Sequence, residues 1–213
     1  MSGAAGAARG PVAAAVIAGG AARRLGGQAK SALVVGDRSI AERLLERLRA
    51  SFARVLVVAN EPGPWAQLGI ELVTDSPSYR GAGPLAGVHA ALTATAGHAG
   101  VVCVAGDMPF VAPALLALLR DHVPGAAAVV PRVAGRPEPL CARWSPVCLP
   151  VIEARLAAGQ RAVHDVFDTV PTIWLDEPAL RAVDRTLRSF ENVNTPEDLD
   201  RVREEGEAGG QSS

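Results

Sequence analysis

Short apolar runs rich in valine and isoleucine alternate along this chain with longer segments whose apolar residues recur at helical spacing. Residues 12–17 (V-A-A-A-V-I) and 54–59 (R-V-L-V-V-A) are runs of the first kind, and residues 40–52 between them have a helical stripe. Strands that are apolar at nearly every position are typical of sheets buried on both faces. We therefore predict the α/β class, as a Rossmann-like three-layer α/β/α sandwich around a mostly parallel, mixed central sheet.

The same two patterns continue toward the end of the chain. Ser39 is a suitable N-cap for the helix at 40–52, and Thr195 followed by Pro196 opens a final helix. We expect further strands at 71–74, 101–105, 127–131, 140–144, 172–175 and 187–190, and further helices at 85–95, 113–122, 147–158, 163–167 and 195–203. One domain over residues 11–203 accounts for them, between low-complexity tails at 1–10 and 204–213 that we expect to be disordered.

The net charge and the cysteine content restrict the functions and the cellular location that this chain can have. There are 21 Lys and Arg residues against 22 Asp and Glu, a net charge of −1, whereas whole-surface binding to nucleic acid or to an anionic membrane needs excess positive charge. The apolar run that begins at residue 12 ends at Gly19-Gly20 and is followed by Arg23-Arg24, so residues 12–17 are interpreted as a strand and not as part of a signal peptide. Cys103, Cys141 and Cys148 are odd in number and lie among apolar residues, so we expect buried thiols in a cytoplasmic protein.

Ligands of such folds bind beyond the carboxyl ends of the strands, so the loop after residue 17 is the first place to look. It reads I17-A-G-G-A-A-R-R-L-G-G-Q-A-K30, and Lys30 is the single lysine in a chain with twenty arginines. Glycines let backbone N–H groups approach an anion, while Arg24 and Lys30 can neutralise phosphate oxygens. The loop therefore predicts a triphosphate cradle, with a solvated Gly/Arg loop as the alternative. It matches neither a P-loop nor a dinucleotide fingerprint.

A second loop, which also follows a predicted buried strand, carries an acidic residue. Asp107 follows the apolar run at 101–105 in the sequence G-D-M-P. A carboxylate at the end of a strand beside a triphosphate is suited to Mg²⁺, which prefers carboxylate, phosphate and water oxygens. The alternative is that Asp107 caps the next helix.

The loop pattern A-G-G-x-x-x-R-L-G-G-x-x-K, with the Asp-x-Pro segment after it, resembles the signature of the MobA-like nucleotidyltransferases. The resemblance extends over roughly residues 12–203, and Ala29 departs from it where many members have Asp. It implies that the loop wraps a nucleoside triphosphate and that Asp107 is a metal ligand, for Mg²⁺ or alternatively Mn²⁺. The loop residues that it assigns to nucleotide binding are Ile17, Ala18, Gly19, Gly20, Arg24, Gly27 and Lys30.

Other segments of the resemblance concern the base of the nucleotide. The sequence G83-P-L-A-G is similar to the guanylyltransferase branch of the family and implies GTP, with Gly83, Pro84 and Leu85 near the guanine. Asp75 matches a nucleotide-contacting aspartate of the family, although a turn aspartate in D-S-P-S is the alternative. Asn60 follows a strand and is assigned to the base or the ribose.

The remaining motifs concern the acceptor. The hairpin R-V-A-G-R-P-E-P-L contains Arg132 and Arg136, for which a contact with the acceptor phosphate and a solvated hairpin are both open. The segment F-E-N-V-N-T-P-E-D-L resembles the C-terminal motif of the family and assigns Asn192 and Asn194 to the acceptor pocket. The implied acceptor is molybdopterin (as the molybdenum cofactor), and the implied protein partners are molybdoenzymes or cofactor-synthesis proteins, met transiently.

These assignments predict transfer of GMP from GTP to the molybdopterin phosphate with release of pyrophosphate, with Arg24, Lys30 and Asp107 as catalytic residues. Two alternatives stay open at this point. One is a nucleotidyltransferase of the same fold that uses CTP or a sugar-phosphate acceptor, and the other is a non-catalytic nucleotide-binding or cofactor-carrier protein.

Overall fold

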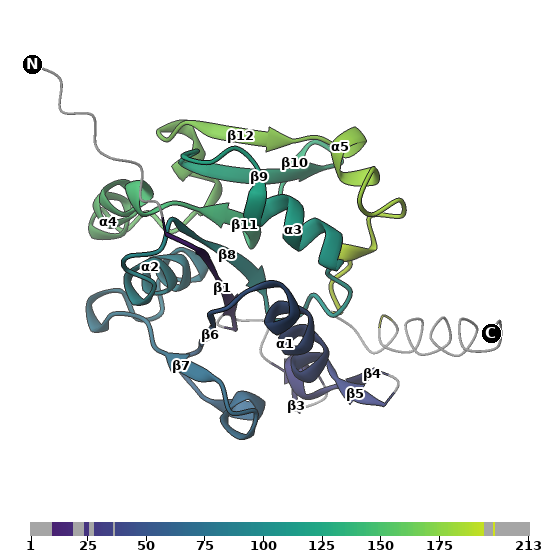
Figure 1. Ribbon diagram of the computed structural model, residues 1–213. Coiled ribbons are helices and arrows are strands. Elements are labelled where there is room, and N and C mark those ends of the chain that lie inside the picture. The colour runs from purple at the N-terminus through teal and green to yellow at the C-terminus, as the bar shows by residue number, and fades with distance from the viewer. Residues whose placement is uncertain (1–9, 19–23, 26–27, 36, 194–197, 199–213) are drawn as a thin grey trace, which may run out of the picture.

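A single eight-stranded sheet forms the middle layer of the molecule (Figure 1). The computed structural model describes residues 10–18, 24–25, 28–35, 37–193 and 198, and only the backbone of 24–25, 28–30 and 35 within them. The strand order is β10-β9-β11-β8-β1-β6-β7, and β12 pairs with β9. The tails at 1–9 and 204–213 and most of the helix expected at 195–203 lie outside the described residues.

The parallel half of the sheet is built around β1 (Val12–Ile17). This strand pairs in parallel with β6 (Val55–Val58) on one side and with β8 (Gly100–Ala105) on the other, and β7 (Glu71–Val73) extends the sheet beyond β6. All residues of β1 after Val12 are buried because helices cover both faces of the sheet. The fold class predicted from apolar runs without alternation is therefore confirmed.

The other half of the sheet mixes strand directions. Strand β11 (Cys141–Trp144) runs antiparallel to β8 and to β9 (Ala128–Val133), while β12 (Thr172–Leu175) is parallel to β9. Strand β10 (Arg136–Pro137) forms a hairpin with the end of β9, and its chain continues directly toward β11. Because β9 is parallel to β8, this hairpin lies at the same edge of the sheet as the carboxyl ends of the central strands.

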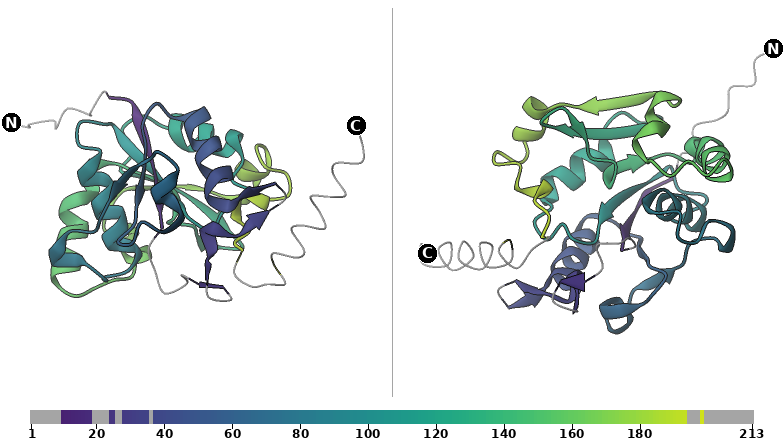
Figure 2. Two further views of the ribbon diagram at one scale, coloured as in Figure 1. Left: turned by 90° about the horizontal axis from the view of Figure 1, so that it is seen from below. Right: turned by 180° about the vertical axis from the view of Figure 1, so that it is seen from behind.

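The helices form two layers, one on each face (Figures 1 and 2). Alternate residues of β1 point to opposite sides: Ala13, Ala15 and Ile17 pack under α2 and α4, whereas Ala14 and Val16 pack under α1, α3 and α5. The helices are α1 (Ile40–Ser51), α2 (Pro84–Ala94), α3 (Pro113–Asp121), α4 (Leu149–Ala157) and α5 (Glu177–Arg181).

Short elements complete the chain. They are β2 (Arg24–Leu25), β3 (Gln28–Ala29), β4 (Val34–Val35), β5 (Arg38–Ser39) and the 3₁₀ turns η1 (Lys30–Ala32), η2 (Gly63–Gln67), η3 (Pro77–Tyr79), η4 (Pro146–Cys148), η5 (His164–Asp168) and η6 (Arg188–Phe190). Within the described ranges, no helix is both long and apolar enough to cross a membrane.

Local sequence signals explain α1 and its start. Ser39 caps the helix: the Ser39 hydroxyl accepts from the Glu42 N–H, and the Glu42 carboxylate accepts from the Ser39 N–H at 2.7 Å. The predicted N-cap is confirmed. The thiols of Cys103, Cys141 and Cys148 are buried and free, also as predicted, and burial raises the pKa of Cys148 to about 11.

The strand expected at 187–190 is wrong, because this segment is the 3₁₀ turn η6. Leu187 has a left-handed backbone (φ 59°), which a strand does not accommodate. The Ser189 N–H donates to the Asp184 carboxylate at 2.7 Å, and the Ser189 hydroxyl accepts from the Ala112 N–H. The spacing of apolar residues in the sequence does not predict these hydrogen bonds of Ser189.

Gly87 allows α2 to lie directly on the end of β1. A Cβ at this position would meet the Cγ2 atom of Ile17 at 2.8 Å. We predict that Gly87→Ala lowers the free energy of unfolding by about 1–3 kcal/mol, because overpacking outweighs the better helix propensity of alanine.

A double-mutant cycle separates these two effects. In an Ile17→Ala background the clash is removed, so Gly87→Ala should raise the unfolding free energy by up to about 1 kcal/mol. Urea unfolding of the four proteins measures both steps. The same sign of effect in both backgrounds would contradict the packing explanation.

Candidate nucleotide site

The carboxyl ends of four parallel strands meet at one edge of the sheet. Ile17 at the end of β1 lies opposite Val58 on one side and Ala105 on the other. The pairing continues just past the strands: the Ala18 N–H donates to the Val58 carbonyl at 2.9 Å, and the Gly106 N–H donates to the Ile17 carbonyl at 3.1 Å. The backbone therefore brings the loops after β1, β6, β7 and β8 together, which is where such sheets bind ligands.

Asn60 and Asp75 form a reciprocal side-chain clamp across two of these loops. The Asn60 Nδ2 group donates to Asp75 Oδ2 at 2.6 Å, and the Asp75 N–H donates to Asn60 Oδ1 at 3.1 Å. Asp75 is only 7% exposed, so its carboxylate needs such a partner. The structure therefore brings these two predicted residues together and gives Asp75 a fixed orientation, beyond the role of a turn aspartate.

Asp107 lies two residues beyond β8, in a loop attached to the C-terminal segment. Its side chain is half-buried, and its backbone carbonyl accepts from the Val193 N–H at 3.1 Å. The N-cap of α3 is Ala112 and not Asp107, so the helix-capping alternative is not what the structure shows. Val193 is buried, and this places the exposed Asn192 beside the Asp107 loop.

A small apolar cluster joins the far end of the glycine-rich loop to the same region. Leu33, Ile40 and Val193 are buried together, with Phe110 packed against them. Lys30 opens the 3₁₀ turn η1, which ends one residue before Leu33 of this cluster. Arg24 is in the hairpin of β2 and β3, and of Arg24 and Lys30 only the backbone is described. Gly19, Gly20, Gly27 and Asn194 lie outside the described residues.

The start of α2 faces this edge as well. Gly83 has a positive φ of 79°, which favours glycine, and Pro84 occupies the first helical turn. Leu85 and Ile17 are buried, so only their backbones can face a ligand. The nucleotide contacts predicted for these residues stay predictions.

Two arginines of the β9–β10 hairpin have different surroundings. Arg132 donates from Nε to the Asp176 carboxylate at 2.8 Å, and its guanidinium lies 4.9 Å from the Trp174 ring centre. Arg136 is exposed, and within the described chain its guanidinium makes no hydrogen bond or ion pair. Of the two arginines, Arg136 is therefore the one that is available to a ligand.

Sequence reasoning missed Glu138, which follows in the same hairpin. This carboxylate is half-buried, and burial raises its pKa above the ordinary glutamate value. The signal that could have found it is an acidic residue between two prolines, in a segment already placed at the ligand edge.

The oxygen ligands at this edge suit a hard divalent cation that also binds phosphate. Among the described residues, no three His, Cys, Asp or Glu side chains come close enough to hold a metal by themselves. Mg²⁺ is commonly held by one or two carboxylates together with substrate phosphates and water. Asp107 fits such a site, in which the nucleotide supplies further ligands.

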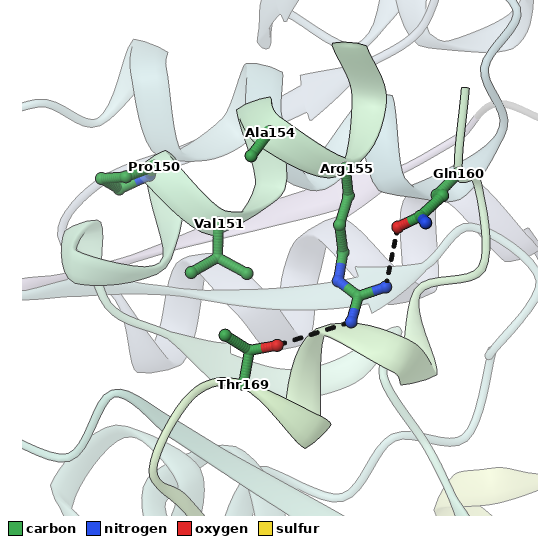
Figure 3. Close-up of a pocket in the computed structure, with 6 residues that line it drawn as sticks. All are labelled: Pro150, Val151, Ala154, Arg155, Gln160 and Thr169. Atoms are coloured by element: carbon green, nitrogen blue, oxygen red, sulfur yellow. Dashed lines mark hydrogen bonds between the residues drawn. The ribbon is translucent and has the colours of Figure 1, made fainter. Parts of the chain in front are cut away.

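A shallow groove elsewhere does not belong to this site (Figure 3). It is lined by residues of α4 and of the turn before β12, namely Pro150, Val151, Ala154, Arg155, Gln160 and Thr169. The Arg155 guanidinium donates to Gln160 and to Thr169 across it and lies 3.7 Å from the Asp165 carboxylate, so its charge is already engaged.

A mostly parallel sheet with its central loops gathered at the carboxyl ends of the strands defines an α/β protein of the class that binds ligands at that edge. Residues 14–172 match the family model described as the MobA-like NTP transferase domain. The chain belongs to this family of nucleotidyltransferases, and the resemblance noted in the sequence is confirmed.

Individual relatives agree with this membership. A probable molybdenum cofactor guanylyltransferase of Pelotomaculum thermopropionicum is 36% identical over 188 residues, which cover 88% of this chain and 90% of the relative. The crystal structure of molybdopterin-guanine dinucleotide biosynthesis protein A from Archaeoglobus fulgidus has a TM-score of 0.77 at 29% identity, and the match covers 92% of this chain and 98% of that one. A Mycobacterium tuberculosis protein solved in complex with manganese shares the fold at 18% identity, with a TM-score of 0.61 and coverage of 92% and 98%.

The Asn60–Asp75 clamp generates a stability prediction. Asn60→Ala leaves the buried Asp75 carboxylate without its amide partner, so we expect the unfolding free energy to fall by about 1–3 kcal/mol. Asn192→Ala is the matched control, because Asn192 is exposed and its loss should change stability by less than about 0.5 kcal/mol. Equal unfolding midpoints for wild type and Asn60→Ala in urea would show that the clamp is not stabilising.

Proposed function

We propose that this protein transfers GMP from GTP to the phosphate of molybdopterin, releasing pyrophosphate and forming the guanine dinucleotide cofactor. The observation that carries this proposal is the convergence of the Ala18, Asn60–Asp75 and Asp107 loops at one edge of the sheet. The names of the relatives support the same donor and acceptor. The buried free thiols suit the reducing cytoplasm as its location, and transient contacts with molybdoenzymes or cofactor-synthesis proteins belong to the same proposal.

The chemistry requires positioning more than activation. The acceptor phosphate is already a nucleophile and attacks the α-phosphorus of GTP, while the bond to the leaving pyrophosphate breaks in line. Arg24, Lys30 and the amides of the glycine-rich loop would neutralise charge on the triphosphate and on the leaving pyrophosphate. Asn60 and Asp75 would hold the nucleoside, with the start of α2 against the guanine, and Arg136, Asn192 and Asn194 would contact the acceptor.

Asp107 would hold Mg²⁺, or alternatively Mn²⁺, whose chemistry is to neutralise phosphate oxygens during the transfer. Asp107→Asn keeps the size of the side chain and removes its charge. We predict that turnover falls by at least about 10²-fold while the fold is retained. Asp121→Asn, on the far end of α3, is the matched control and should turn over at the wild-type rate. Wild-type turnover in Asp107→Asn would contradict the metal role, and nucleotide binding without any turnover in the intact protein would favour a carrier.

Lys30 provides a second test within the loop. Lysine presents a compact charge on a flexible stem, whereas arginine presents a wide planar fork. We predict that Lys30→Arg loses most turnover and keeps the wild-type unfolding midpoint. A wild-type rate in this variant would mean that any cation suffices at position 30.

The choice of nucleotide and acceptor is tested by pyrophosphate release. GTP, CTP, ATP and UTP are each supplied with molybdopterin or with a sugar phosphate, and we expect release only with GTP and molybdopterin. Activity with CTP alone would support the cytidylyltransferase alternative and contradict this proposal.

A further inference from the structure

A bulge in the sheet places Glu138 next to the end of β8. Pro137 lies opposite Arg132, and Arg143 lies opposite Val129. Between these two pairs, β9 advances by three residues and the partner strand by six, so three extra residues bulge out between β10 and β11. The bulge is attached to β8, because the Ala105 N–H donates to the Leu140 carbonyl at 2.7 Å. Glu138 is the last paired residue before this bulge, because its N–H donates to the Pro131 carbonyl at 2.9 Å, and Asp107 follows Ala105 by two positions.

The bulge lies across β8 from the nucleotide loops. Strand β1 pairs with one side of β8, while the bulge and β11 occupy the other side. The Asp107 loop stands between these two halves of the edge. A molecule that must deliver a phosphate to the nucleotide at Asp107 therefore has the bulge side of the edge available to it.

Glu138 and Arg136 share one face of the sheet. They are two residues apart, so their side chains point to the same side, and both lie on the side that carries α3 and the C-terminal segment. The register agrees: the Glu138 N–H bond to Pro131 continues the pairing of Arg136 with Val133, and Val133 packs on that side. Asn192 is brought to the same region by the bond between Val193 and Asp107.

The Glu138 carboxylate has no internal partner. Within the described part of the chain it accepts no hydrogen bond and makes no ion pair, although it is half-buried. A half-buried carboxylate loses part of its hydration, and without an internal donor its hydrogen bonding is left to solvent or to a ligand. The Glu138 carboxylate makes no bond that the fold requires, and a ligand with N–H groups would replace the solvent beside it.

We propose that Glu138 is an acceptor-specificity residue, whose carboxylate accepts two N–H groups from the ring of the acceptor substrate. This inference rests on the proposed function. The 2-amino-4-oxo ring of a pterin presents a ring N–H beside an exocyclic amino group, and two carboxylate oxygens match that pair of donors. Guanine has the same edge, but the position of Glu138 across β8 from the nucleotide loops assigns it to the acceptor.

The test compares Glu138→Gln with wild type in pyrophosphate release. The substitution keeps size and turns one acceptor oxygen into a donor that opposes the ring N–H. At saturating GTP we expect the KM for molybdopterin to rise about tenfold or more, with kcat and the KM for GTP within about twofold of wild type. Glu46→Gln, on the exposed side of α1, is the matched control and should leave all three constants unchanged.

Thermal unfolding supplies a readout that separates a ligand role from a structural one. The folded-state pKa of Glu138 lies above its unfolded value, so the folded state binds more protons between the two values and stability falls as pH rises through that window. Glu138→Gln should therefore unfold at a higher temperature than wild type at pH 7.5, and this advantage should vanish at pH values below both pKa values. A lower unfolding temperature for Glu138→Gln at pH 7.5 would indicate a structural role.

The kinetic measurements distinguish failure of this inference from failure of the proposed function. An active wild type whose KM for molybdopterin is unchanged by Glu138→Gln contradicts this inference alone. A raised KM for GTP would assign Glu138 to guanine, and a raised requirement for Mg²⁺ would assign it to the metal; both overturn the proposal. A wild type that releases no pyrophosphate from GTP and molybdopterin contradicts the proposed function, and this inference with it.

Discussion

The parallel pairing of β1 with both β6 and β8 is the constraint on which the site depends. Each strand exposes its carboxyl end at the same edge, so backbone pairing brings together four loops that are far apart in sequence, and the Asn60–Asp75 bond ties two of them. Helices on both faces make this pairing stable, because the strands are apolar on both sides. The small residues of β1 and Gly87 of α2 let the first helical turn lie close to the end of the central strand.

The two sides of this edge are built differently. On the side of β6 and β7, the Asn60–Asp75 clamp fixes a carboxylate by hydrogen bonds within the protein. On the side of β9 and β11, the side chains of Glu138 and Arg136 have no such bonds in the described chain and are open to a ligand. A fixed side and an open side suit the proposed enzyme, in which two different substrates would meet at Asp107.

Local elements could be predicted from the sequence wherever one residue and its near neighbours decide the outcome. The α1 cap at Ser39 and the buried strand β1 agree with prediction because hydrogen bonds and apolar spacing within a few residues determine them. The expected strand at 187–190 is a 3₁₀ turn in which Ser189 binds Asp184 and also Ala112, which is distant in the sequence. The bulge before β11 could not be predicted from the sequence, because a bulge is a difference in residue count between two paired strands. It is therefore defined only once the register with β9 is known.

The sequence by itself determined the α/β class, the family and the residue types of the triphosphate loop, since these follow from periodicity and from a motif that is contiguous in the chain. Only the tertiary structure decided that Asn60 binds Asp75, that Arg132 is committed to Asp176 while Arg136 is available, and that Glu138 is half-buried beside the end of β8. The physical reason is that desolvation and hydrogen-bond partnership belong to pairs of distant residues, and strand register is what brings those pairs together.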